Sequence, residues 1–83
     1  MSKREKLIRR MLNNPKTVGF DELVGVLEFE GCELQSSSGS HYTYTHPDLD
    51  GILTVPYKRP HVKRRYVEQA ISWLNLEEKY GSR

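Results

Sequence analysis

Apolar residues recur along the first third of the chain with the spacing of amphipathic helices. In residues 3–13, the apolar positions 7, 8, 11 and 12 form one stripe opposite the arginines and lysines. Ser2 and Glu5 have the spacing of a capping box, and the Asn-Asn-Pro that follows ends this helix. A second stripe, at positions 20, 23, 24 and 27, predicts a helix over residues 20–30 with Gly31 just past its end.

The periodicity then changes from helical to alternating. Three short runs alternate apolar and polar residues and are rich in β-branched and aromatic side chains: residues 32–37, 41–45 and 52–55. Turn-forming residues at 38–39 and 47–51 separate the runs, and Pro56 closes the third run because proline cannot donate to a ladder. The pattern predicts three strands in an antiparallel meander.

A last stripe, at positions 67, 70, 71 and 74, predicts a helix over residues 63–79. The expected order is α-α-β-β-β-α within a single domain, residues 1–83. We expect an α+β fold with the helices packed on one face of the sheet and the other face partly open. Because a domain of this size buries only about 60–65% of its unfolded surface, an elaborate cofactor pocket is not expected.

Charge is arranged in three blocks, although the formal net charge is only +2. Residues 1–16 hold six basic residues and one acid, residues 17–57 hold seven acids and no lysine or arginine, and residues 58–83 hold seven basic residues and three acids. This layout favours one anion-binding surface and one acidic surface on the same domain. A solvated surface with uneven charge is the alternative.

Histidine is the main candidate for chemistry. His41 and His46 lie five positions apart, on opposite faces of a regular strand, and no cysteine cluster accompanies them, so we expect no metal site and no cofactor. An exposed His41 suits proton transfer in RNA cleavage, where the 2′-hydroxyl of the substrate is the nucleophile. An ordinary half-exposed strand residue is the alternative. His46 is expected to hydrogen-bond at its turn, and His61 to touch phosphate or only solvent.

Two further groups of residues leave open questions. The basic run at residues 58–65 has the charge to hold phosphate and to stabilise negative charge in a transition state. Tyr42 and Tyr44 share one strand face, which either packs into the core or offers a stacking surface to bases. The placement of the helices decides between these two roles.

The cellular setting is indicated by cysteine usage and by the first residues. Cys32 is the only cysteine, so it has no internal disulfide partner; we expect it near the core and the protein in a reducing compartment. The sequence MSKREKL is charged and has no long apolar run. We therefore expect a cytoplasmic protein without signal peptide, membrane helix or membrane partner.

Residues 39–71 resemble the HicA family of bacterial toxins, small endoribonucleases of type II toxin–antitoxin systems. The shared pattern is carried in order by Gly39-Ser40-His41, Tyr44, His46-Pro47, the apolar run from Ile52 to Pro56, and the basic loop and helix from Lys63 to Ile71. The resemblance implies a fold similar to double-stranded RNA-binding domains. It also implies metal-independent cleavage of mRNA and inhibition by a cognate HicB-like antitoxin protein.

The resemblance also implies roles for individual residues. It makes His41 the catalytic residue, with Gly39 and Ser40 shaping the approach to the strand and Ser40 a candidate to hydrogen-bond the phosphate. Expected structural residues at the site are Tyr44, His46 and Pro47. Expected contacts to the RNA backbone are Lys58, Arg59, His61, Lys63, Arg64 and Arg65.

The chain departs from the family pattern at two places, and two other functions remain open. Tyr42 follows His41 where many relatives have a second histidine, and the loop YKRPHVKRR replaces their glycine-rich or lysine-rich spacing. A non-catalytic RNA-binding module of the same fold would bind RNA without cleaving it. A protein-interaction module, with its partner over the strands and the basic loop, would lack the steep salt dependence of phosphate binding.

Overall fold

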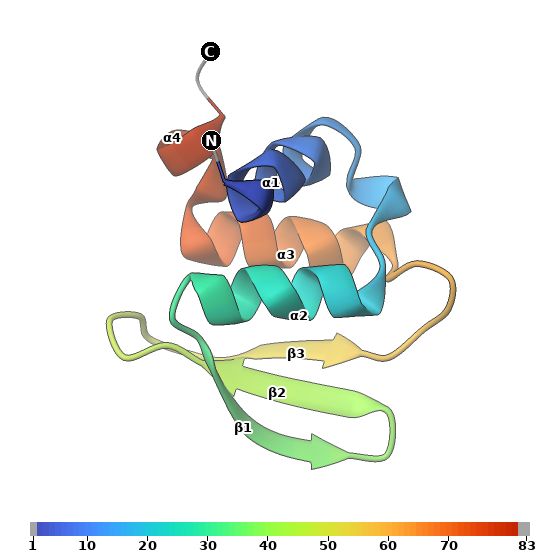
Figure 1. Cartoon of the computed structure of the whole chain (residues 1–83). Coiled ribbons are helices and arrows are strands. Elements are labelled where there is room, and N and C mark those ends of the chain that lie inside the picture. Colours follow the sequence, from blue (N-terminus) through green and yellow to red (C-terminus); the bar gives the residue numbers. More distant parts are fainter. Residues whose placement is uncertain (1, 82–83) are drawn as a thin grey trace.

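The computed structural model describes residues 2–81, in which helices precede and follow a three-stranded sheet, as the sequence predicts (Figure 1). The elements are α1 (Lys3–Asn13), the 3-10 turn η1 (Pro15–Thr17), α2 (Phe20–Phe29), β1 (Glu33–Ser38), β2 (His41–Thr45), β3 (Leu53–Pro56), α3 (Arg64–Leu74) and α4 (Leu76–Tyr80). The predicted α+β class is therefore confirmed. The turn η1 had no counterpart in the sequence prediction.

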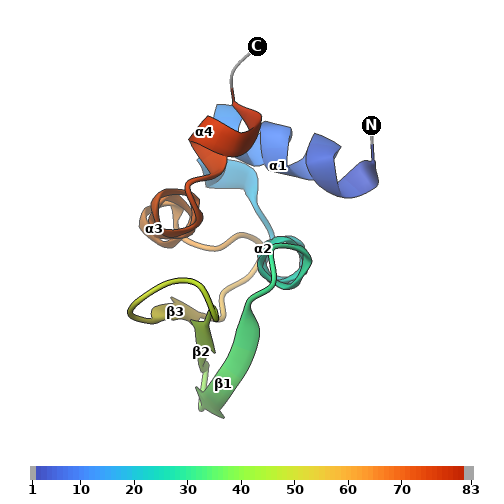
Figure 2. The same cartoon turned by 90° about the vertical axis from the view of Figure 1, so that its left-hand side faces the viewer.

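The elements form three layers rather than two. Helices α2 and α3 cover one face of the sheet, and α1 and α4 lie on the far side of these two helices (Figures 1 and 2). The apolar stripe of α1 explains this position, since Ile8 and Met11 are completely buried although α1 is remote from the strands. The prediction that helices cover one sheet face is correct for α2 and α3, whereas α1 and α4 pack on other helices.

The sheet is an antiparallel meander in the order β1-β2-β3, as predicted. His41 pairs with Ser38 of β1 and with Pro56 of β3. The register of β1 shifts by one residue between Leu34 and Ser36, which marks a β-bulge in this edge strand. Every residue of β1 is exposed, so β2 and β3 supply the buried part of the sheet.

The tyrosine pair of β2 faces the helices. Tyr44 is 3% exposed, and Tyr42 packs its ring against Phe20 of α2 at a centroid distance of 5.0 Å. On the opposite face, the hydroxyl groups of Thr43 and Thr54 lie 3.2 Å apart. The core-facing alternative for the tyrosines is therefore correct, because α2 covers their side of the sheet, and they do not form a stacking surface for bases.

The predicted helix over residues 63–79 is wrong as one continuous element. Asn75 adopts a left-handed conformation with φ of 58°, which ends α3 and starts α4 in a new direction. The carboxylate of Glu30, at the end of α2, accepts hydrogen bonds from Lys79 at 2.8 Å and from Tyr80 at 2.7 Å. The bond to Glu30 raises the pKa of Tyr80 to about 12. These contacts fix the position of the short helix α4. Hydrophobic periodicity did not predict them, because they join residues far apart in the sequence.

Local signals near the first two helices are confirmed. The Ser2 hydroxyl accepts a hydrogen bond from the Glu5 amide, and the Glu5 carboxylate accepts one from the Ser2 amide. Gly31 has φ of 95° just past α2. Cys32 is a buried free thiol, and burial raises the pKa of Cys32 to about 11. Between residues 2 and 81, no helix has both the length and the apolar character needed to cross a membrane.

Candidate functional site

His41 is presented at the start of β2 by a two-residue hairpin turn. Gly39, the first central residue of this turn, has φ of 59°, whereas Ser40 keeps a negative φ. A positive φ at the first central position alone is the mark of a type II′ turn, in which glycine is preferred. The side chain of His41 is exposed, so the turn places an accessible imidazole at one end of the sheet.

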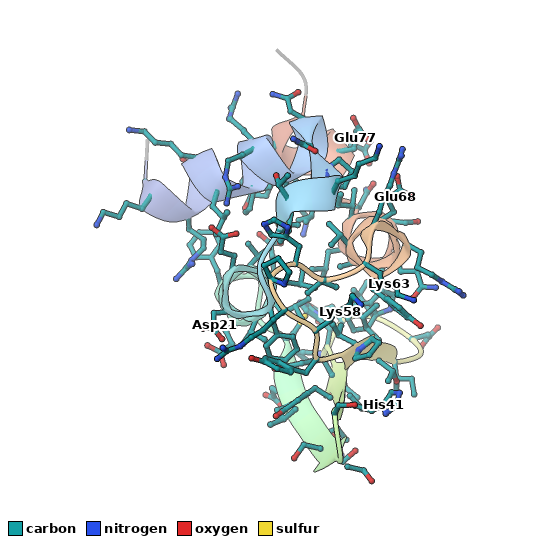
Figure 3. The ribbon with its side chains drawn as sticks, turned by 90° about the vertical axis from the view of Figure 1, so that its right-hand side faces the viewer. Asp21, His41, Lys58, Lys63, Glu68 and Glu77 are labelled. Carbon is teal, nitrogen blue, oxygen red and sulfur yellow. The ribbon has the colours of Figure 1, made fainter. Side chains whose placement is uncertain are left out.

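His41 lines a shallow pocket of about 250 Å³ together with basic and aromatic side chains. Its other lining residues are Pro56, Tyr57, Lys58, Lys63 and Tyr66. Figure 3 shows Lys58 and Lys63 on the same side of the molecule as His41. Both lysines are exposed. The pocket thus combines an exposed histidine with two positive charges that are available to an anion.

The loop that carries the two lysines is held at both ends. At its start, the Tyr57 amide donates a hydrogen bond of 2.6 Å to the carbonyl of Ser40. At its end, the Val62 amide donates to the carbonyl of Val18 at 2.8 Å, and the Val62 side chain is 1% exposed. Lys63 follows directly as the N-terminal cap of α3. Backbone contacts therefore position the loop next to the hairpin turn that presents His41.

The remaining basic side chains of residues 58–65 point to different neighbours. Arg59 donates a hydrogen bond to the Tyr57 hydroxyl, and Arg64 forms an ion pair with Glu68 at 2.7 Å. The guanidinium of Arg65 lies 5.2 Å from the ring centroid of Tyr66. The structure thus brings Lys58 and Lys63 into the His41 pocket, while the three arginines lie outside the set of residues that line it.

His61 lies in the basic loop, near enough to α2 for its charge to affect Glu22. The pKa of Glu22 is lowered by the hydrogen bond from the Gly19 amide and by Arg10, with a smaller contribution from the charge of His61. His61 is exposed and does not line the His41 pocket. The expected phosphate contact of His61 would therefore have to be made outside this pocket.

His46 and Pro47, two further residues of the expected site, lie in the turn after β2. Nδ1 of His46 accepts a hydrogen bond from the Asp48 amide at 3.0 Å, and Nε2 donates to the carbonyl of Glu30 at 2.8 Å. These roles follow from each other, because an imidazole that accepts at Nδ1 carries its proton on Nε2. His46 thus joins the turn after β2 to the end of α2, as expected for local hydrogen bonding at a turn. Pro47 is exposed in the same turn.

Two tyrosines of the His41 pocket were not found from the sequence. Tyr57 follows the proline that closes β3, and Tyr66 lies in the first turn of α3. The position of Tyr57 between Pro56 and the basic run was the available signal, since loop residues next to a candidate site are themselves candidates. As for metal ligands, residues 2–81 contain no group of three or more histidine, cysteine, aspartate or glutamate side chains that would hold an ion.

Comparison with known proteins gives the family. The model of the HicA toxin of bacterial toxin–antitoxin systems matches residues 20–74, which is more than half of the chain and includes the hairpin, the basic loop and α3. No curated protein and no solved structure matches the chain. The matched segment contains all the residues that line the His41 pocket. The chain therefore belongs to the HicA family, the toxins of bacterial toxin–antitoxin systems.

Proposed function

We propose that this toxin is an endoribonuclease that cleaves mRNA without a metal ion, and that His41 is its proton-transfer residue. The single observation that carries the proposal is the shared pocket of His41, Lys58 and Lys63. An exposed imidazole is able to exchange protons with a substrate, and two adjacent ammonium groups attract the phosphate that the substrate brings. The HicA family, known as mRNA interferases, agrees with this chemistry.

The reaction needs no cofactor because RNA supplies its own nucleophile. Neutral His41 accepts the proton of a 2′-hydroxyl while that oxygen forms a bond to the adjacent phosphorus. The bond from phosphorus to the 5′-oxygen of the next nucleotide breaks, and that oxygen takes a proton from a water molecule. The proton held by His41 then neutralises the hydroxide that is left, which restores the neutral imidazole. The products are a 2′,3′-cyclic phosphate and a 5′-hydroxyl. Lys58 and Lys63 stabilise the negative charge that grows on the phosphoryl oxygens in the transition state.

The rest of the basic surface would bind the RNA backbone away from the scissile bond. Arg65 is exposed at the start of α3, next to Tyr66 of the pocket, and Arg64 is engaged with Glu68. Arg59 lines the pocket between the loop and α2, and His61 is exposed in the same loop. Such contacts weaken with salt and do not depend on sequence.

A toxin of this family has a cognate antitoxin, and we propose that a HicB-like protein blocks the site directly. Lys58 and Lys63 are exposed, so an acidic segment of the antitoxin would cover His41 and residues 58–65. A complex of the two proteins should then leave mRNA intact and shield these lysines from amine-reactive labelling. Failure of the protein encoded next to the toxin gene to block cleavage would contradict this arrangement.

The decisive experiment measures cleavage of a mixed mRNA by the purified protein in excess EDTA. His41→Ala should abolish cleavage. His61→Ala, which removes an exposed imidazole outside the pocket, should at most weaken RNA binding and should leave cleavage of the bound RNA in place. End-group analysis should find 2′,3′-cyclic phosphate and 5′-hydroxyl termini. Cleavage that requires a divalent ion, or that survives in folded His41→Ala, would overturn the proposal. Binding of RNA without cleavage by the parent protein would favour the non-catalytic module.

A further inference from the structure

A second shallow pocket, of about 300 Å³, adjoins the His41 pocket. Phe20 and Asp21 of α2 line it on one side, and Tyr57, Lys58 and Arg59 line it on the other. Tyr57 and Lys58 also line the His41 pocket, so the two pockets share one wall. In Figure 3, Lys58 lies between Asp21 and His41. A strand with a phosphate beside His41 therefore has this second pocket next to it.

Tyr57, the aromatic residue of the shared wall, is held in place and is still accessible. Tyr57 is 40% exposed. Its ring meets that of Phe20 edge-on, at a centroid distance of 5.0 Å and an angle of 75°, so this contact covers at most one of its two faces. Arg59 holds the hydroxyl of Tyr57, and the carbonyl of Ser40 holds its amide. A tyrosine held at its backbone and at its hydroxyl group loses little conformational freedom when a base stacks on its ring.

The charges of the second pocket suit a base better than a phosphate. Asp21 is exposed at the pocket, with Glu22 beside it in the sequence, so a phosphate there would meet carboxylates as well as Lys58 and Arg59. A nucleobase is uncharged, stacks on aromatic rings, and carries donor and acceptor groups that suit a rim of both signs. The two pockets thus differ in the part of a nucleotide that each accommodates.

We propose that Tyr57 is the stacking platform for one unpaired base that flanks the phosphate beside His41. This inference rests on the proposed function and extends it to the form of the substrate. A base that enters the pocket has to leave its own helical stack, so the site selects single-stranded RNA over duplex RNA. Tyr57 acts in substrate binding and takes no part in proton transfer.

Binding measurements in a His41→Ala background test the inference, because the RNA stays intact under the proposed mechanism. Each variant is titrated with a single-stranded RNA oligomer and with an abasic oligomer that has the same number of phosphates. Tyr57→Leu should bind the RNA oligomer about tenfold more weakly and the abasic oligomer unchanged. Tyr57→Phe keeps the ring and loses only the hydrogen bond from Arg59, so it should retain most of the parent affinity for the RNA oligomer. Lys58→Ala is the matched control and should weaken binding of both oligomers by the same factor.

Tyr57→Trp gives a second readout that does not depend on the loss of packing in Tyr57→Leu. Its emission, after subtraction of the Trp73 signal of the parent protein, should be quenched by the RNA oligomer and not by the abasic oligomer. Equal weakening of both oligomers by Tyr57→Leu, or quenching by both oligomers, would show that Tyr57 only positions the loop. Unchanged binding of both oligomers by Tyr57→Leu would show that no base binds in this pocket.

These outcomes separate the inference from the proposed function. A protein that cleaves mRNA through His41 but binds RNA independently of Tyr57 overturns the inference alone. Base-dependent binding through Tyr57 by a parent protein that does not cleave overturns the proposed nuclease and leaves the base site in place.

Discussion

The amide of Tyr57 donates a 2.6 Å hydrogen bond to the carbonyl of Ser40, and this bond joins the two segments that form the candidate site. Ser40 precedes His41 in the hairpin turn, and Tyr57 precedes Lys58 in the basic loop. The bond continues the pairing of β2 with β3 by one residue beyond His41 and Pro56. The imidazole and the first lysine of the loop are therefore placed together by backbone contacts and not by the side chains themselves.

Loss of Lys63 should slow cleavage and reduce the salt dependence of RNA binding. Lys63 lines the His41 pocket, where its ammonium group would stabilise the transition-state charge, so Lys63→Ala should lower the cleavage rate by about tenfold or more. If Lys63 neutralises one phosphate, the slope of log K against log salt should fall by about 0.7. Lys16→Ala, at an exposed residue of η1, should change neither quantity. Equal effects of the two substitutions would contradict a specific role for Lys63.

His46 should contribute to stability and not to catalysis. His46→Ala removes the hydrogen bonds to the carbonyl of Glu30 and from the amide of Asp48, and it opens space in a half-buried site. The free energy of unfolding should fall by about 2 kcal/mol, measured by urea denaturation. The rate of cleavage per folded molecule should stay unchanged, because His46 does not line the His41 pocket. A stable His46→Ala variant without activity would instead place His46 in the mechanism.

Glu22 should make stability depend on acid pH. The Gly19 amide and Arg10 bind its carboxylate and hold the pKa of Glu22 below its ordinary value of 4.5. A pKa lowered in the folded state gives stability that is present above pH 4.5 and is lost as the pH falls through the folded pKa. Because the side chain is 42% exposed, solvent screening limits this stability, which we expect to be about 0.5–1 kcal/mol.

Urea denaturation of Glu22→Gln at several pH values measures this dependence. The variant should be less stable than the parent at pH 7, and the difference should shrink toward pH 3 as the parent loses its charged carboxylate. Glu28→Gln is the control, since Glu28 is an exposed residue of the same helix. A stability difference for Glu22→Gln that is independent of pH would mean that the carboxylate acts through its shape and not through its charge.

Local sequence patterns determined most of the secondary structure. The capping box at Ser2 and Glu5, the helical stripes, the alternating strands and the turn glycines are each properties of neighbouring residues, and the elements lie within one or two residues of their predicted bounds up to the end of β3. Alternation along β2 also placed His41 and Tyr44 on opposite faces of the strand. These features required no knowledge of contacts between distant segments.

Tertiary structure decided what the patterns left open, because each case depends on residues far apart in the chain. Packing of α2 on the sheet turned Tyr42 toward the core, and Glu30 fixed α4 in a direction that helical periodicity does not encode. The fold also divided the basic run at residues 58–65. It brought two lysines to His41 and left the three arginines with other neighbours. Tyr57 became a candidate only when the fold placed its ring between two pockets. A sequence gives the charge and size of these side chains, but only the packed fold gives their neighbours.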